Sequence, residues 1–77
     1  MSQRILVSRV AFRSLDIVEL TVWRLASRFG KVVAITMFPE RDEVVVELSS
    51  AEAAQSAYLR LNSFIMFGRM ISVSMIC

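Results

Sequence analysis

The centre of this 77-residue chain, residues 32–48, reads VVAITMFPERDEVVVEL. Two runs rich in β-branched residues, 32–38 and 43–48, flank a short polar segment that begins at Pro39. Runs of this length and composition favour β-strands, and a short polar link between them favours an antiparallel hairpin. We therefore expect a two-stranded unit in the middle of the chain.

A helix is expected before this hairpin. Apolar residues between Ile17 and Phe29 recur at i, i+3 and i+4, which is the spacing of one helix face. Ser14 and Asp16 are both suitable N-caps, and Gly30 suits a left-handed C-cap. This pattern predicts a helix over residues 17–29.

A second helix and two outer strands complete the predicted fold. Residues 49–52, Ser-Ser-Ala-Glu, look like a cap followed by a helix that runs to Leu61. Residues 5–10 and 69–75 have the composition of strands. The order β-α-β-β-α-β predicts an α+β, ferredoxin-like sandwich, in which two helices cover one face of a four-stranded antiparallel sheet. We expect one domain spanning 1–77.

Alternation along the strands divides their side chains between two faces. The residues expected to face the helices are Ile5, Val7, Ile35, Met37, Val44, Val46, Leu48, Ile71 and Val73.

The composition argues against catalysis. The chain has no His, its single Cys is Cys77, and its two Gly residues form no phosphate-binding loop. Ser–His and Cys–His nucleophiles and His-based metal sites are therefore not expected. We predict a non-enzymatic domain with no cofactor, no metal and no small-molecule substrate.

The formal net charge of +2 is only mildly basic. Every apolar run is much shorter than the segment of about 20 residues that a helix needs to span a bilayer. The N-terminus also lacks the apolar core of a signal peptide. These features predict a nuclear or cytoplasmic protein without a membrane partner. The hydrophobic fraction of 56% is high for so small a domain, which indicates apolar side chains outside the core. The scarcity of Lys and Gly is also compatible with an engineered sequence.

Local motifs resemble those of the RNA recognition motif family along nearly the whole chain. The matching segments are Ile5–Val10 for the strand-one hexamer, Phe29-Gly30-Lys31-Val32, Arg41–Leu48 for the strand-three octamer, Ser49–Ala54, Leu61-Asn62, Gly68-Arg69, Ile71 and Val73. The aromatics that stack on bases in this family are replaced here by Leu6, Glu43 and Val45. In this respect the chain resembles the subgroup of polypyrimidine-tract-binding protein, the L-type heterogeneous nuclear ribonucleoproteins and matrin.

The resemblance implies binding of single-stranded RNA, and a role in RNA processing, through the open face of the sheet and the basic strand ends. The residues expected to contact RNA are Arg4, Leu6, Ser8, Arg9, Thr36, Phe38, Arg41, Val45, Arg69, Met70 and Ser72. Lys31 and Ser74 lie in similar positions of the pattern. Glu43 and Glu47 are expected on the same face and would repel phosphates.

A protein-interaction module on the same fold is the alternative hypothesis. Its motivation is the apolar excess, carried on the sheet by Leu6, Val45 and Met70 and on the first helix by Val18 and Trp23. Such a module would form a homodimer through the sheet or bind a partner peptide beside the first helix. The sequence leaves both hypotheses open.

Overall fold

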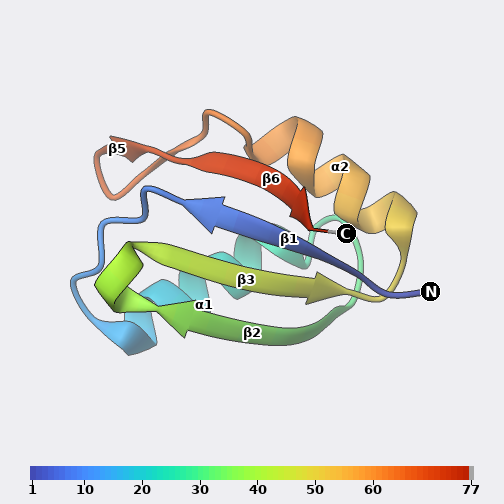
Figure 1. Cartoon of the computed structure of the whole chain (residues 1–77), viewed down its shortest axis with the longest axis horizontal. Helices are drawn as coiled ribbons and strands as arrows, with labels where there is room; N and C mark the ends of the chain where they lie inside the picture. The colour runs from blue at the N-terminus through green and yellow to red at the C-terminus, as the bar shows by residue number, and fades with distance from the viewer. Residues whose placement is uncertain (77) are drawn as a thin grey trace.

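Both helices lie on one face of a four-stranded antiparallel sheet (Figure 1). The computed structural model describes residues 1–76, so Cys77 lies outside the described residues. The elements in chain order are β1 (Gln3–Ser8), α1 (Leu15–Ala26), β2 (Val32–Phe38), a 3₁₀ turn η1 (Pro39–Arg41), β3 (Glu43–Leu48), α2 (Ala51–Leu61), β4 (Ile65–Met66), β5 (Arg69–Met70) and β6 (Ser72–Ile76). The sheet order is β2-β3-β1-β6, which confirms the predicted ferredoxin-like arrangement.

The central hairpin forms where the sequence predicts it. β2 and β3 have the predicted bounds and pair antiparallel, with a bulge between Val32 and Ala34. The turn between them ends at Asp42, which has a left-handed φ of 56° and donates its N–H to the Pro39 carbonyl. Asp tolerates this conformation better than most residues, so the turn chemistry fixes the register of the hairpin.

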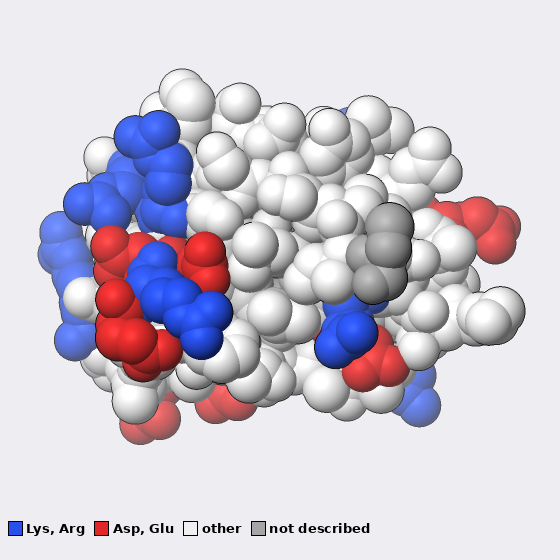
Figure 2. All heavy atoms as spheres, in the orientation of Figure 1, with Lys and Arg blue, Asp and Glu red and all other residues white. Residues whose placement is uncertain are grey.

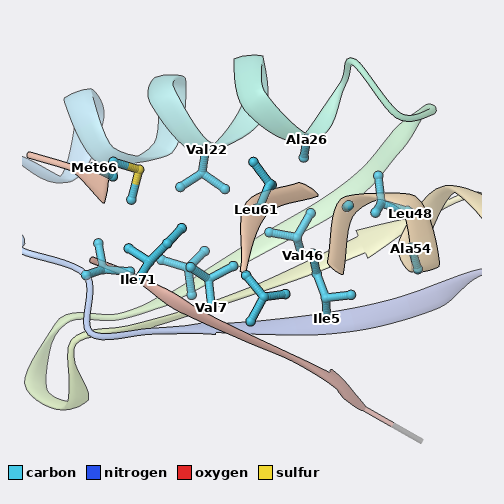
Figure 3. Close-up of a cluster of buried hydrophobic side chains, with 14 of the residues drawn as sticks. Ile5, Val7, Val22, Ala26, Val46, Leu48, Ala54, Leu61, Met66 and Ile71 are labelled. Carbon is cyan, nitrogen blue, oxygen red and sulfur yellow. The ribbon is translucent and has the colours of Figure 1, made fainter. Parts of the chain in front are cut away.

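The core lies between the sheet and the helices (Figure 3). Seven of the nine strand residues predicted to face the helices are buried, and the other two, Ile35 and Met37, are partly buried against the same cluster. The helices add small and aliphatic side chains: Val18, Val22 and Ala26 from α1, and Ala53, Ala54, Ala57 and Leu61 from α2. The period-two burial of the strands leaves the opposite face of the sheet uncovered.

Gly30 has a role other than the predicted one. α1 ends at Ala26 rather than Phe29, and its C-cap is Ser27 in right-handed helical geometry, so the prediction of Gly30 as a left-handed cap is wrong. A Cβ atom at Gly30 would lie 2.5 Å from the Cβ of Ala53, which is shorter than the contact distance of two non-bonded carbon atoms. Gly30 therefore permits the chain to pass directly against α2.

Two strands differ from their predicted bounds. β1 covers Gln3–Ser8 rather than 5–10, because Arg9 takes a left-handed φ of 65° that ends the extended conformation. The predicted strand 69–75 is divided into β5 and β6. A two-residue turn, Phe67-Gly68, with positive φ at both positions folds β5 back onto β4. This is the geometry of a tight hairpin turn, and it removes Arg69 and Met70 from the main sheet.

Candidate nucleic-acid interface

The middle of the open sheet face is a row of four side chains, one from each strand. Leu6 on β1 lies opposite Val45 on β3 and opposite Ser74 on β6, and Val45 lies opposite Thr36 on β2. The register thus places two aliphatic side chains at the centre with a hydroxyl at each side. Leu6 and Val45 are half-buried, whereas Thr36 and Ser74 are exposed.

At one end of this row the face carries a pair of opposite charges. Arg4 lies opposite Glu47 on β3 and opposite Ile76 on β6, and Glu47 lies opposite Ala34 on β2. Arg4 is exposed and Glu47 half-buried. Because opposite charges face each other here, this end presents little net charge to a ligand.

At the other end, Phe38 and Arg41 form a corner of the face. Phe38 is the last residue of β2 and lies opposite Glu43 on β3. The guanidinium carbon of Arg41 lies 4.8 Å from the centre of the Phe38 ring, and Arg41 Nη1 lies 3.9 Å from Glu43 Oε1. Ser8 on β1 and Ser72 on β6 lie opposite each other at the same end of the sheet. The corner therefore combines the Phe38 ring with the planar guanidinium of Arg41, while these two hydroxyls lie two and three strands away from Phe38.

Three arginines reach this end of the sheet. Arg9 precedes Val10, whose N–H donates to the Asp42 carbonyl at 2.9 Å, and Arg69 Nη1 lies 3.5 Å from Asp42 Oδ2. Arg41 is the third. Three carboxylates lie in the same region, those of Glu40 and Asp42 in the turn and that of Glu43 at the start of β3. Figure 2 shows this face with an uncharged middle and with both signs of charge gathered over the turn between β2 and β3.

Two residues expected at an interface lie elsewhere. Met70 lies outside the four-stranded sheet, in β5 opposite Ile65, because the Phe67-Gly68 turn interrupts the predicted strand; it is 53% exposed there. Val18 is wholly buried in the core, so it is not available to a partner, and its place in the protein-interaction hypothesis is wrong. Periodicity alone could not separate the two apolar faces of α1.

The sequence reasoning missed two features of the site. It treated Phe38 and Arg41 as separate contacts, although a Pro-initiated turn brings residues i and i+3 onto one side and could have suggested their stacking. It also missed Asp42, which holds Arg69 from β5. The sequence had no signal for that pair, since it depends on where the β4–β5 hairpin folds.

Among residues 1–76, no three His, Cys, Asp or Glu side chains lie close enough to hold a metal ion. No helix in this range is long and apolar enough to cross a membrane.

Two solved structures share the fold. RNA-binding protein PG1 superposes with a TM-score of 0.83 at 21% sequence identity, covering 96% of this chain and 93% of that one. The Nab3 RRM, in a structure concerned with cis-element recognition of non-polyadenylated RNAs, superposes with a TM-score of 0.78 at 11% identity, covering 92% and 89%. No protein-family model matches the sequence, and no curated protein matches it significantly. The likeness therefore concerns the architecture of the whole domain.

Proposed function

We propose that this domain is a non-catalytic module that binds single-stranded RNA on the open face of its sheet. The observation that carries the proposal is the row Thr36–Val45–Leu6–Ser74 on the uncovered face of the sheet. The row lies between the corner where Arg41 stacks on Phe38 and the opposite end, where Arg4 faces Glu47. Two of the solved domains with this fold, one an RNA-binding protein and the other studied for RNA recognition, support the choice of ligand.

In this proposal, the central row contacts the bases. Leu6 and Val45 give apolar contact to base faces, and the hydroxyls of Thr36 and Ser74 donate to and accept from base edges. The two serines at the Phe38 end extend this hydrogen-bonding set. A base stacked at Phe38 contributes about 1–3 kcal/mol, the usual value for aromatic stacking.

The arginines at the turn contact phosphates only after leaving their carboxylates. Arg41 and Arg69 each have an acidic partner in the free domain, so RNA must compete with Glu43 and Asp42. Binding by the isolated domain is then weak at physiological salt, where each phosphate contact is worth less. Additional RNA-binding units in a larger assembly would raise the affinity by avidity.

The absence of aromatic residues at the stacking positions supports a more specific proposal about the subgroup of RNA-binding proteins. Leu6, Glu43 and Val45 occupy the stacking positions, as in the polypyrimidine-tract-binding, L-type ribonucleoprotein and matrin subgroup. We propose that the domain, like that subgroup, binds RNA through an aliphatic sheet face during RNA processing, in the nucleus or cytoplasm.

The proposal is tested by amide proton–nitrogen NMR titration with a mixed-sequence single-stranded RNA at low and at physiological salt. We expect shifts at Leu6, Thr36 and Val45 that persist at physiological salt. Leu6→Asp should abolish them. The matched control is Leu59→Asp, which adds the same charge at an exposed position on α2 and should leave binding unchanged. Shifts confined to arginines and erased by salt, or equal effects of the two variants, would overturn the proposal.

A further inference from the structure

The outer edge of β2 is uncovered. β2 pairs only with β3, and among residues 1–76 no other segment forms a hydrogen bond with its outer side. The other edge strand, β6, has bonded partners near its start. Asn62 Oδ1 accepts the N–H of Val73 at 3.0 Å. Just before the strand, Ser63 donates its N–H to the Ile71 carbonyl, and Ile71 donates its N–H to the Phe64 carbonyl. The outer backbone groups of β2 therefore have no bonded partner within residues 1–76, whereas the start of β6 is covered.

β2 carries only one of the usual protections of an edge strand. Its seven residues, Val32–Phe38, include no charged residue and no proline, and its one irregularity is the bulge near its start. At the bulge Val33 is left out of the register and its side chain is 52% exposed. Unpaired edge strands normally carry charges, prolines or bulges that hinder strand addition, and the bulge at Val33 is the one such device in β2. A long uncharged edge is the form expected where strand addition is used.

α1 presents a second face beside this edge. Asp16, Glu19, Leu20 and Trp23 are spaced i, i+3, i+4 and i+7 and form one stripe along the helix. All four are exposed, and Leu20 and Trp23 are each 49% exposed. This stripe is separate from the core face of α1, which carries Val18, Val22 and Ala26. Exposed apolar stripes beside a free strand edge mark binding grooves.

The stripe and the strand enclose a groove of about 410 Å³. One wall is the α1 stripe, and the other is formed by β2 residues 32–35. α1 and β2 run in opposite directions (Figure 1), and the two carboxylates come from the first half of α1 whereas Trp23 lies in its last turn. The groove thus has an acidic end and an apolar end.

The charge of the groove indicates its ligand. Two carboxylates line it, and no Lys or Arg does. Within residues 1–76 neither Asp16 nor Glu19 forms an ion pair, since the two salt bridges found involve other residues. Such a lining repels phosphates, which argues against RNA, and a second copy of the groove would double the acidic charge at the contact. A basic, apolar polypeptide meets both requirements.

We propose that this groove binds an extended, basic peptide segment of a partner protein, which adds to the outer edge of β2 as a fifth strand. Main-chain bonds to β2 supply affinity, and alternate side chains enter the groove. Aliphatic side chains pack against Leu20, Trp23 and Val33, and a Lys or Arg side chain reaches Asp16 and Glu19. Because the peptide would bind at the edge of the sheet, the open face would stay free for RNA.

The probe is a phage-displayed library of random peptides of about ten residues, enough to span β2. Selected peptides should carry aliphatic residues at alternate positions and at least one Lys or Arg. A synthetic peptide from the selection should shift the amides of residues 33–36 and the indole N–H of Trp23. N-methylation at alternate positions should reduce affinity more than about tenfold in one register and less than about twofold in the other, because only one side of an added strand bonds to β2.

Matched variants locate the charge contact. The double variant Asp16→Asn/Glu19→Gln should lower the affinity for the peptide about tenfold and make peptide binding less dependent on salt. Glu52→Gln, at an exposed position of α2 outside the groove, is the control and should have no effect. Circular dichroism of the variants confirms that the helices are retained.

RNA titrations with the same variants separate this proposal from the proposed function. The Asp16/Glu19 variant should bind RNA unchanged, and Leu6→Asp should bind the peptide unchanged. The proposal is overturned if no peptides are enriched, if enriched peptides are acidic, if both N-methylated registers bind equally, or if the groove amides respond to RNA or to self-association instead.

Discussion

The guanidinium group of Arg41 lies over the ring of Phe38, 4.8 Å from its centre, across the turn that ends β2. Cation–π contacts at exposed positions contribute about 0.5–1 kcal/mol, so the pair holds the corner of the sheet without fixing it rigidly. Glu43, which lies opposite Phe38, is also within 3.9 Å of Arg41. The arginine therefore has two partners in the free domain and can exchange one of them for a phosphate.

Phe38→Ala should weaken RNA binding about tenfold, since loss of one stacked base costs about 1–3 kcal/mol. Arg41→Lys should have a smaller effect at low salt, because it keeps the charge and loses the planar group that stacks. Fluorescence anisotropy with a labelled single-stranded RNA measures both. Equal affinity of Phe38→Ala and the wild type would show that no base stacks at this corner.

Asp42→Asn should strengthen RNA binding a few-fold, because it releases Arg69 to contact a phosphate. Asn keeps the left-handed conformation of this position, so the turn should be retained. The slope of log affinity against log salt should steepen by about one phosphate contact. Stability should change by about 0–1 kcal/mol, as expected for an exposed ion pair. If affinity instead falls, the carboxylate contributes to binding and the competition is refuted.

Ser50→Ala should destabilise the domain by about 1 kcal/mol in urea unfolding, because the Ser50 hydroxyl accepts the N–H of Ala53 at 3.1 Å and caps α2. Ser14→Ala is the matched comparison. Ser14 is the N-cap residue of α1, but its side chain forms no capping bond, so this change should cost much less. Similar losses for both variants would contradict the capping geometry.

Gly30→Ala should destabilise the domain by about 1–3 kcal/mol, the usual cost of inserting a methyl group into a packed contact. The added Cβ would lie 2.5 Å from the Cβ of Ala53. Ala53→Gly in the same chain should recover part of the loss by removing the opposing atom, although Gly inside a helix itself costs about 1 kcal/mol. Additive losses in the double variant would show that the two residues do not meet.

Several features of the fold follow from local sequence. The bounds of β2 and β3, the cap at Ser50 and the alternation that buries Val44, Val46 and Leu48 all depend on residues close together in the chain. Period-two and period-3.6 patterns report which residues share a face, and short polar turns report which strands are neighbours. These signals sufficed for the topology and for the central row of the open face.

The positions that sequence misplaced depend on packing between distant segments. Gly30 looks like a helix cap until Ala53 is brought against it, and Val18 looks no different from Trp23 until the sheet covers one side of α1. Met70 belongs to a strand pattern that the Phe67-Gly68 turn interrupts. The pairing of Arg69 with Asp42 joins residues 27 positions apart.

The chain's local patterns thus settle the order of the elements, the strand register within the central hairpin and the aliphatic character of the open face, because each is encoded by neighbouring residues. Which face of α1 is buried, which strand edge stays free, and which carboxylates hold the arginines are settled only when the elements pack. Those outcomes depend on contacts across long sequence separations, whose free energy no local pattern contains.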